Sequence, residues 1–417
     1  MQIILNKYPS VLFRLDYIYD EQYIIIAPSK KAKKFEDALK SGERVAQIVF
    51  LNDYTFPNLV SKIREISETV EIESIFTLCE EYIDWAGYLN DHFVERNSVA
   101  VSNVMFKDKF FMRSFLQGIV EQPYFRLLES REDLEKFWNL CNTEVAILKP
   151  RRGAACTGIR KVTNDTLLDD SYFMENYIIE EYVDIKKMIT CDGYAIGKDI
   201  KRFFVHDNVE LLLDSLTTKG YYLLRTSELY QDLNLIRCAY LECQNVIKEF
   251  SVDGEMTPFH FEWFFDVKRK RVVFCEVGKR FGGGDIPDLI KEAFNVDVLK
   301  EYWQIKTSKN NFQGIVYNDD LPKPQKIGAT FASYVQSGIV QSLPNTKELS
   351  WASRVYVGLK VGDDVQTIGN IIDNSMIVRF ISDDEADFSH KIRQVKEANQ
   401  KIKYKSGSVK RKVDYVE

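Results

Sequence analysis

Short apolar runs alternate with amphipathic stretches over the first hundred residues of the chain. The apolar runs have the length and the β-branched content of buried strands, and they fall at residues 2–6, 22–27, 44–51 and 74–78. Between them, apolar residues recur every three or four positions, which predicts helices near residues 31–41, 57–68 and 79–95. Alternation of this kind indicates a parallel α/β layer.

The pattern continues into a second α/β segment and then changes. Strands are predicted at residues 144–150, 159–162 and 177–183, and a hairpin or two adjacent strands at 193–207. Helical spacing predicts helices around 105–120, where Pro123 closes the pattern, from Leu229 to Phe250, and near 286–295. Beyond about residue 310 the pattern indicates a smaller α+β lobe. Its predicted strands fall at 313–319, 326–335, 353–364 and 375–384, and its closing helix at 384–400.

Two glutamates, Glu262 and Glu276, occupy mirror-image positions in the strand-like runs 257–267 and 271–278. A hairpin that turns at Arg269 sets them opposite each other, where like charges about 5 Å apart repel. A divalent cation offsets that repulsion, and Mg²⁺ in proteins is usually held by one or two carboxylates while nucleotide phosphates fill its other positions. The pair therefore suggests a metal–nucleotide site. The alternative is a solvated hairpin face whose charges never meet.

Lys149 ends a predicted strand and precedes a loop that contains Gly153 and Gly158. Glycines let the main chain approach phosphate closely, and a lysine at the strand end supplies charge to the same oxygens. The loop is therefore interpreted as a mobile phosphate cover, against the alternative of an ordinary hairpin turn with an exposed lysine. Cys156 in this loop is interpreted as a small filling residue, because no histidine or second cysteine is near it in the sequence.

Glu180 and Glu181 end the next predicted strand. Neighbouring side chains of a strand alternate between its faces, so only one of the two can point into a given cleft. There it could accept a hydrogen bond from a ribose hydroxyl, and main-chain groups at Tyr182 and Val183 could pair with an adenine edge. Acidic pairs at strand ends are also common on protein surfaces.

Arg280 lies four residues after Glu276 and just before three glycines at 282–284. A guanidinium beside a metal and phosphates can hold the transferred group or a substrate carboxylate in bidentate fashion. The alternative is a surface arginine before a flexible turn. His260 shares the inward face with Glu262 under strict alternation, and we interpret it as a supporting residue rather than a base.

Composition and charge narrow the classes of function. The chain has 417 residues, 45% of them hydrophobic, which is enough for more than one core. A net charge of -6 and a pI of about 5.6 give no global positive field for nucleic acid or an anionic membrane. The start of the chain lacks the order of a signal peptide, and no apolar run is long enough to span a bilayer, so we expect a soluble cytoplasmic protein.

Several kinds of site do not fit this sequence pattern. The seven cysteines are scattered and the four histidines have no ligand spacing, which argues against zinc, iron–sulfur clusters and a disulfide framework. The chain also contains neither a Gly-x-Ser-x-Gly elbow nor a Walker phosphate loop. A hydrolase triad and a P-loop nucleotide site are therefore disfavoured.

Five segments of the chain, taken in their order, resemble the ATP-grasp superfamily of carboxylate-activating ligases. The resemblance covers roughly residues 1–300 and extends to the end lobe. It is carried by KDKFFMR (107–113), ILKPRRGAACTGIRKV (147–162), IIEEYV (178–183), HFEWFFD (260–266) and CEVGKRFGGGDIPDLI (275–290). Gly278 stands where many relatives carry a metal-binding asparagine. This makes the last segment most similar to L-amino-acid ligases and carrier-protein aminoacyl ligases.

The resemblance implies a multi-lobed fold of α/β and α+β class, the ATP-grasp fold. It implies an N-terminal Rossmann-like parallel α/β domain at residues 1–100 and an ATP-grasp central lobe at 101–184. A lobe with the metal site would follow at 185–308, and a C-terminal α+β lobe with a basic tail at 309–417.

The resemblance also implies roles for single residues. The residues expected to contact ATP are Lys109, Lys149, Gly153, Gly158, Glu180, Glu181 and Val183. Glu262 and Glu276 would hold Mg²⁺, with Mn²⁺ as an alternative. Arg280 would have a catalytic role at the transferred phosphate or the acyl-phosphate.

The implied reaction is phosphorylation of an amino-acid carboxylate by ATP, followed by attack of an amine on the acyl-phosphate. Positioning and charge neutralisation supply most of such catalysis, so no protein nucleophile is needed. Two free amino acids are the expected substrates, joined by a peptide bond with release of ADP. The alternative is a ligase of antibiotic or other secondary metabolism that loads an acidic acyl carrier protein on its phosphopantetheine. A homo-oligomer is compatible with either activity.

The chain departs from the family pattern in two places. After EEYV, relatives usually show a glycine and then a glutamate, whereas this chain has Ile185 and Lys187. The resemblance therefore does not imply that these two positions recognise a ribose or a substrate amine. The same departures leave the alternative of a catalytically inactive nucleotide-binding regulator. The phosphate loop carries residues 154–156 in place of the usual serine, so its contacts must come chiefly from main-chain amides.

The C-terminal segment 401–413 is basic in an otherwise acidic chain. It reads either as a frayed, solvated tail or as a docking patch for an acidic partner such as a carrier protein.

Overall fold

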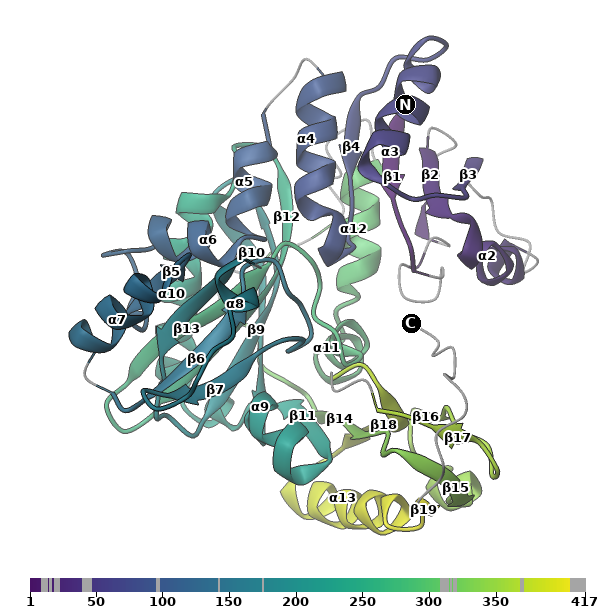
Figure 1. Cartoon of the computed structure of the whole chain (residues 1–417). Helices are drawn as coiled ribbons and strands as arrows, with labels where there is room; N and C mark the ends of the chain where they lie inside the picture. Colours follow the sequence, from purple (N-terminus) through teal and green to yellow (C-terminus); the bar gives the residue numbers. More distant parts are fainter. Residues whose placement is uncertain are drawn as a thin grey trace.

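The computed structural model describes residues 1–8, 14, 17–18, 23–39, 47–94, 98–141, 143–174, 176–307, 315, 317, 321–367 and 371–405. Most of the strand predicted at 313–319 and the basic segment after Lys405 lie outside these ranges. Figure 1 shows four sheets, the largest of which runs through the middle of the molecule. No helix in the described ranges has the length and apolar character that a membrane crossing needs.

The chain begins with the parallel α/β layer that its sequence pattern predicts. Four parallel strands form a sheet in the order β3-β2-β1-β4. The strands are β1 (Gln2–Leu5), β2 (Tyr23–Pro28), β3 (Gln47–Leu51) and β4 (Ser74–Phe76). The helices of this layer are α2 (Ala32–Leu39), α3 (Phe56–Ser67) and α4 (Ile83–Phe93).

A small antiparallel sheet forms the second layer. Its strands lie in the order β5-β8-β6-β7. They are β5 (Phe125–Leu128), β6 (Val145–Pro150), β7 (Arg160–Thr163) and β8 (Tyr177–Glu181). The helices around it are α5 (Ala100–Met105), α6 (Lys109–Phe115), α7 (Arg131–Leu140) and α8 (Ser171–Met174).

An eight-stranded antiparallel sheet connects the two halves of the chain, in the order β13-β12-β9-β10-β11-β14-β18-β16. Its strands are β9 (Met188–Ile196), β10 (Asp199–Asn208), β11 (Tyr221–Thr226), β12 (Met256–Asp266), β13 (Arg271–Gly278), β14 (Ile327–Tyr334), β16 (Arg354–Val357) and β18 (Asn374–Ser382). Beside it lie α9 (Leu212–Asp214), α10 (Leu233–Phe250), α11 (Ile286–Phe294), α12 (Val298–Thr307) and α13 (Glu385–Asn399). A three-stranded sheet of β17 (Asp364–Val365), β15 (Gly338–Ser342) and β19 (Lys403–Lys405) completes the fold.

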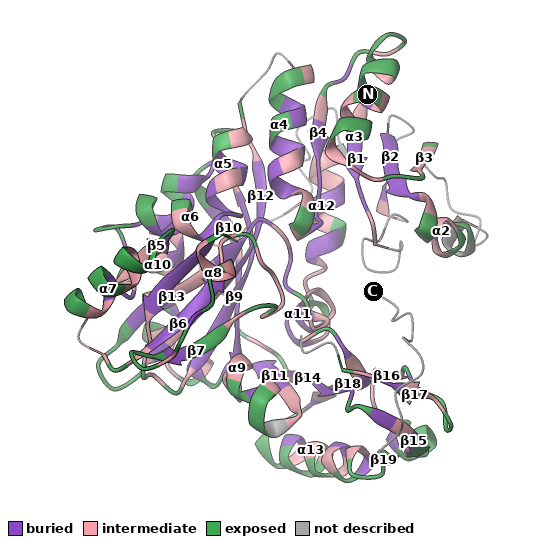
Figure 2. Cartoon of the chain, viewed as in Figure 1, coloured by how far each residue is buried: buried purple, intermediate pink, exposed green. Residues whose placement is uncertain are grey.

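The two faces of the large sheet have different functions, because side chains alternate along its strands. Phe259, Phe261 and Trp263 of β12 point to one face, where they pack with the buried side of α10. The buried residues drawn in purple in Figure 2 concentrate in these strands. His260 and Glu262 point to the other face, which is left for a cavity. Helices α11 and α12 cover the neighbouring part of that face and connect it to the N-terminal layer in one core.

Two predicted helices differ from the structure. The helix expected around 105–120 is interrupted after Met105, because Asp108 caps a new helix by accepting from the main-chain N–H groups of Phe110 (3.0 Å) and Phe111 (3.4 Å). The long helix expected from Leu229 begins only at Leu233, after a 3₁₀ turn over residues 228–231. Helices α7 and α12 and strands β5, β11 and β15 are among the elements that were not predicted from the sequence, and the strand predicted at 353–364 is two separate strands, β16 and β17.

Replacement of Gly193 by alanine tests the packing of β9 between β10 and β12. A Cβ atom there would lie 1.9 Å from the carbonyl oxygen of Arg202, and the φ angle of 156° also disfavours a side chain. We expect Gly193→Ala to lower the free energy of unfolding by about 3 kcal/mol in urea denaturation. The control Gly254→Ala has a φ of 76° and no atom within 4 Å of its Cβ, so it should cost only about 1 kcal/mol. Equal costs would contradict the steric argument.

Candidate functional site

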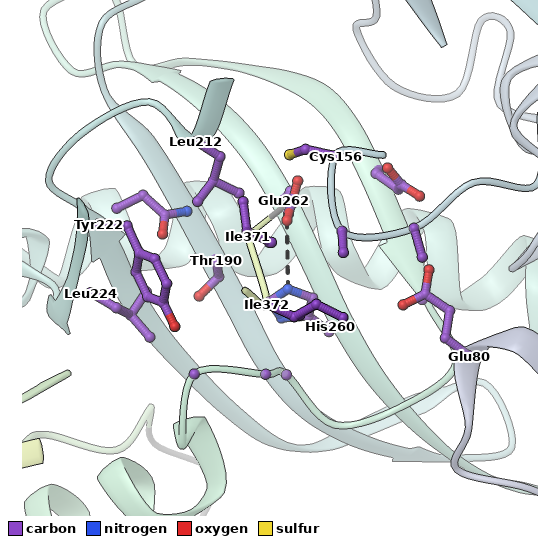
Figure 3. Close-up of a pocket in the computed structure, with 18 of the residues that line it drawn as sticks. Glu80, Cys156, Thr190, Leu212, Tyr222, Leu224, His260, Glu262, Ile371 and Ile372 are labelled. Carbon is purple, nitrogen blue, oxygen red and sulfur yellow. Dashed lines mark ion pairs between the residues drawn. The ribbon is translucent and has the colours of Figure 1, made fainter. Parts of the chain in front are cut away.

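A cavity of about 710 Å³ lies between the small sheet, the large sheet and the C-terminal strands. Figure 3 shows part of its lining. The structure brings nine of the ten residues assigned from the sequence into this cavity: Lys109, Lys149, Gly153, Glu180, Glu181, Val183, Glu262, Glu276 and Arg280. Gly158 does not line it. Its φ is 73°, and a Cβ atom added there would lie 2.9 Å from Pro150 Cγ, so this glycine serves the turn and its contact with a nucleotide stays a prediction.

Glu262 and Glu276 are direct partners in the ladder between β12 and β13, as predicted, although the turn is centred between residues 268 and 269 and not on Arg269. Nearer the turn, Trp263 pairs with Phe274. If this register continued unbroken, the next pair would be Glu262 with Cys275. A bulge shifts the register by one residue and places Glu276 opposite Glu262 instead. Both side chains keep partial exposure, 21% and 24%, toward the cavity.

Lys109 lies against this pair. Its Nζ is 2.6 Å from Glu276 Oε1 and donates a hydrogen bond of 2.8 Å to the carbonyl oxygen of Gly153. Asp108 fixes the start of the helix that presents the lysine, and it also forms an ion pair with Arg151 at 2.8 Å. One cation thus connects the carboxylate pair to the loop between β6 and β7.

Lys149 is buried beside a second carboxylate. Its ammonium group forms an ion pair with Glu180, and Arg113 Nη2 lies 2.5 Å from the other oxygen of that carboxylate. Burial opposes the charge of Lys149, but the neighbouring Cys275 and Glu180 raise its pKa above the usual range. The side chain of Glu181 has a different partner, because it accepts from the main-chain N–H of Tyr124 at 3.2 Å, although both residues line the cavity and only one was expected to do so.

The loop between β6 and β7 presents main-chain donors. Ala155 and Cys156 have φ angles of 54° and 58°, a left-handed conformation that is rare for residues with a side chain. In the described part of the chain, the N–H groups of Ala154, Ala155 and Cys156 donate to no acceptor. Successive N–H groups in such turns form concave anion sites. Burial raises the pKa of the Cys156 thiol, which agrees with a filling role.

Arg280 also lines the cavity, opposite the N-terminal layer. Its Nε lies 2.5 Å from Oε2 of Glu80, at the start of the turn after β4. Burial would raise the pKa of Glu80, but Arg280, Lys107 and Lys109 outweigh it and lower this pKa to about 2. Glu80 is therefore ionised at every physiological pH.

His260 lies below Glu262 on the cavity floor (Figure 3). Its Nδ1 is 2.7 Å from Oδ1 of the fully buried Asp192, and its Nε2 is 3.7 Å from Glu262. Burial disfavours the charged ring, but Asp192 outweighs this effect and raises the pKa of His260 to about 9. The imidazole thus carries a proton at neutral pH and supports Glu262 as a cation, in agreement with its predicted supporting role.

Solved ligase structures resemble the chain over nearly its whole length. It matches the L-amino acid ligase from Bacillus licheniformis with a TM-score of 0.72 and 14% identity, over 98% of each chain. N5-carboxyaminoimidazole ribonucleotide synthetase from Thermus thermophilus matches with a TM-score of 0.63 and 14% identity, over 95% of this chain and 98% of that one.

A third match is the biotin carboxylase domain of the Hydrogenobacter thermophilus 2-oxoglutarate carboxylase, in complex with MgADP and bicarbonate. Its TM-score is 0.62 at 12% identity, over 97% of this chain and 90% of that one. No protein-family model matches the sequence, and no curated protein is significantly similar to it.

The chain has the ATP-grasp fold. Within this fold, the residues present fit a magnesium–nucleotide complex. Two opposed carboxylates supply hard oxygen donors, and the unpartnered amides of the loop at 154–156 supply donors for phosphate. No cluster of three or more acidic, histidine or cysteine ligands occurs in the described part of the chain, so phosphate oxygens would have to complete the coordination of the metal.

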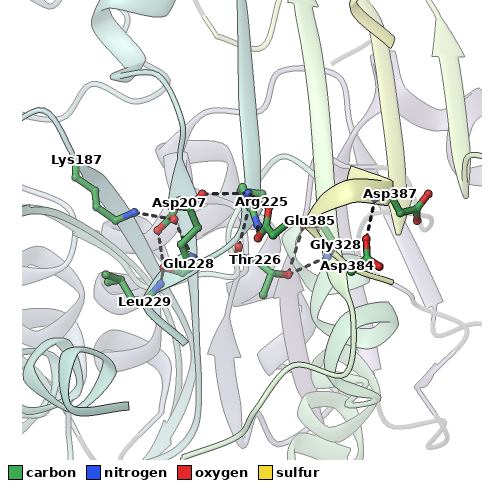
Figure 4. Close-up of polar contacts among 11 residues, drawn as sticks. Lys187, Asp207, Arg225, Thr226, Glu228, Leu229, Gly328, Asp384, Glu385 and Asp387 are labelled. Atoms are coloured by element: carbon green, nitrogen blue, oxygen red, sulfur yellow. Dashed lines mark hydrogen bonds and ion pairs between the residues drawn. The ribbon is translucent and has the colours of Figure 1, made fainter. Parts of the chain in front are cut away.

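Lys187, which replaces an expected glutamate of the ATP-grasp pattern, takes no part in the cavity lining. Its Nζ lies 2.7 Å from Oδ2 of Asp207, a carboxylate that also accepts from Ser227 Oγ (2.5 Å) and from the main-chain N–H of Glu228 (3.0 Å). Figure 4 shows this group at the junction of β10 and β11. The lysine side chain is therefore engaged in a structural ion pair.

The sequence pattern indicated no role for Glu80, Arg113 or Asp192, although all three contact residues of the cavity lining. The sequence did contain a signal for Arg113. It lies four residues after Lys109, and residues at this spacing share one face of a helix. Glu80 and Asp192 had none, since each reaches its partner from an element distant in the sequence.

The raised pKa of His260 makes the stability of the ATP-grasp fold depend on pH. Its folded pKa of about 9 is above the ordinary value, so the protonated pair with Asp192 stabilises fully below about pH 6.5 and this contribution is lost as the pH rises through 9. Over that range we expect the wild type to lose about 3 kcal/mol more unfolding free energy than His260→Gln. Urea denaturation at a series of pH values measures this.

The exposed His92 provides the control for this measurement. His92→Gln should keep the pH dependence of the wild type. If His260→Gln kept it too, the ion pair between His260 and Asp192 would not be its source.

Proposed function

We propose that the protein is an ATP-dependent ligase that activates an amino-acid carboxylate as an acyl-phosphate and transfers it to an amine. One observation carries the proposal: Glu262 and Glu276 face each other in the same cavity as Lys109, Lys149 and a loop of unpartnered amides. The likeness to the L-amino acid ligase supports an amino acid as the carboxylate. The complex of another neighbour with MgADP supports the nucleotide and the metal.

The reaction has two displacements. A carboxylate oxygen of the substrate bonds to the γ-phosphorus of ATP while the bond to the ADP oxygen breaks. An amine nitrogen then bonds to the acyl carbon, phosphate leaves, and the nitrogen loses a proton. Both steps develop negative charge on phosphate oxygens, which Mg²⁺, when bound, helps to neutralise.

The residues of this chain would position those groups. Glu262 and Glu276 would hold the metal, and Lys109 and Lys149 would exchange their carboxylate partners for phosphate oxygens. The main-chain donors of the loop at 154–156 would cover the phosphates. Arg280 would likewise give up its ion pair with Glu80 and bind the oxygens of the transferred phosphoryl group. Glu180, Glu181 and Val183 would line the adenosine.

Two alternatives remain as proposals of lower support. An acyl carrier protein as acceptor rests on the basic C-terminal segment, most of which lies outside the described residues. A nucleotide-binding regulator rests on the replacements at Ile185 and Lys187, and the ion pair of Lys187 with Asp207 gives that lysine a structural role.

Removal of one metal carboxylate tests the proposed ligase. With ATP, Mg²⁺ and a panel of all amino acids singly and in pairs, we expect the wild type to release ADP and to form hydroxamates when hydroxylamine is added. Glu276→Ala and Glu276→Gln should lose about 100-fold or more of that release, because the metal site is broken. Phosphate detection and mass spectrometry measure both products.

The control is Glu135→Ala, a change of the same type at an exposed position of α7. It should keep full turnover, and all variants should keep the circular dichroism spectrum of the wild type. Retained turnover in both Glu276 variants would refute the metal role. Nucleotide binding without ADP release across the whole panel would favour the regulator.

A further inference from the structure

One face of the large sheet forms the floor of the whole cavity. The ladders connect Glu276 to Glu262 on β12 and Glu262 to Thr190 on β9. Farther along the same face, Tyr222 on β11 is the partner of Ala332, which is the partner of Ile377 on β18. Strand β11 is three strand spacings from β12, which is roughly 14 Å.

The end of the cavity at β11 and β18 is apolar. Leu212, Tyr222, Ile371 and Ile377 line it, and each is only half-buried although each is large. They come from helix α9, from two strands and from the segment before β18, so the chain brings them together only in three dimensions. In Figure 3, Leu212, Tyr222 and Ile371 lie on one side of Glu262, and Glu80 lies on the other.

The two arginines near this end are already paired. Arg354 Nη1 lies 2.5 Å from Oδ1 of Asp285, and Arg379 lies 3.3 Å from the other oxygen of that carboxylate. Asp214, which also borders the cavity, is exposed to solvent. Burial raises the pKa of Tyr222, so its phenol stays neutral. An anionic ligand group would find no free cation among these residues.

We propose that this apolar end, formed by Leu212, Tyr222, Ile371 and Ile377, binds the bulky uncharged side chain of an amino-acid substrate. The inference rests on the proposed ligase function and specifies its substrate. The end is continuous with the metal carboxylates in one cavity, and the three strand spacings between β12 and β11 leave room for a metal, a phosphoryl group and an amino acid.

The physical basis of selection is the cost of burying polar groups. An apolar side chain removes half-exposed leucine, isoleucine and tyrosine surface from water, which is favourable. An amide or a charge of the same size loses its hydration there, and the aliphatic side chains of Leu212, Ile371 and Ile377 offer it no hydrogen-bond partner. The site therefore discriminates most strongly between amino acids of similar shape and different polarity.

The first test compares isosteric substrates with the wild-type protein. Leucine against asparagine and methionine against glutamine are each supplied with ATP, Mg²⁺ and every other amino acid, and ADP release is measured. We expect kcat/KM to be at least about tenfold higher for the apolar member. Equal values within both pairs would overturn this inference and leave the ligase function intact. No ADP release with any amino acid would instead overturn the function on which the inference rests.

The second test places a cation at the apolar end. Leu212→Lys should lower kcat/KM for leucine and methionine by about tenfold or more and should raise it for glutamate, with the KM for ATP unchanged. The matched control is Val209→Lys, three residues earlier at an exposed position outside the cavity lining, which should behave as the wild type. Identical amino-acid profiles for the two variants would contradict the proposal. The wild-type comparison decides the matter if Leu212→Lys does not fold.

Discussion

Two carboxylates that face each other across neighbouring strands repel, and the surrounding structure is organised around that constraint. Glu262 and Glu276 hold this position in β12 and β13 because a bulge adds one residue to the register. Without a partner, such a pair on a half-buried face would favour separation or protonation. Lys109 at 2.6 Å from Glu276 and the protonated His260 beneath Glu262 supply the compensation.

The same principle repeats across the cavity. Lys149 and Arg113 neutralise Glu180, and Arg280 neutralises Glu80. A buried ion whose partner is removed costs several kcal/mol, so each cation keeps a carboxylate until another anion replaces it. Phosphate groups are such anions. The cavity is thus a set of compensated charges that a nucleotide and a metal can reorganise, with an apolar end in which no such exchange is needed.

Elements whose stability depends on local pattern were predictable. The parallel strands β1 to β4 and the glutamate hairpin follow directly from apolar periodicity, but the opposition of Glu262 and Glu276 also requires a bulge. The break before Asp108 was missed because a side-chain cap there outweighs continuous helical periodicity. Likewise, the bulge that sets the register of the glutamates lies inside a strand that reads as regular in the sequence.

The sequence by itself determined which residues carry charge and which faces of strands and helices are apolar, because these properties depend on neighbours a few positions apart. It therefore specified the ATP-grasp layers and nine of the residues that line the cavity. Only the tertiary structure decided which charges meet, such as Glu80 with Arg280 across 200 positions, and which apolar residues stay half-buried at the end of the cavity. Contacts of that kind arise from the packing of distant elements, and no local pattern encodes them.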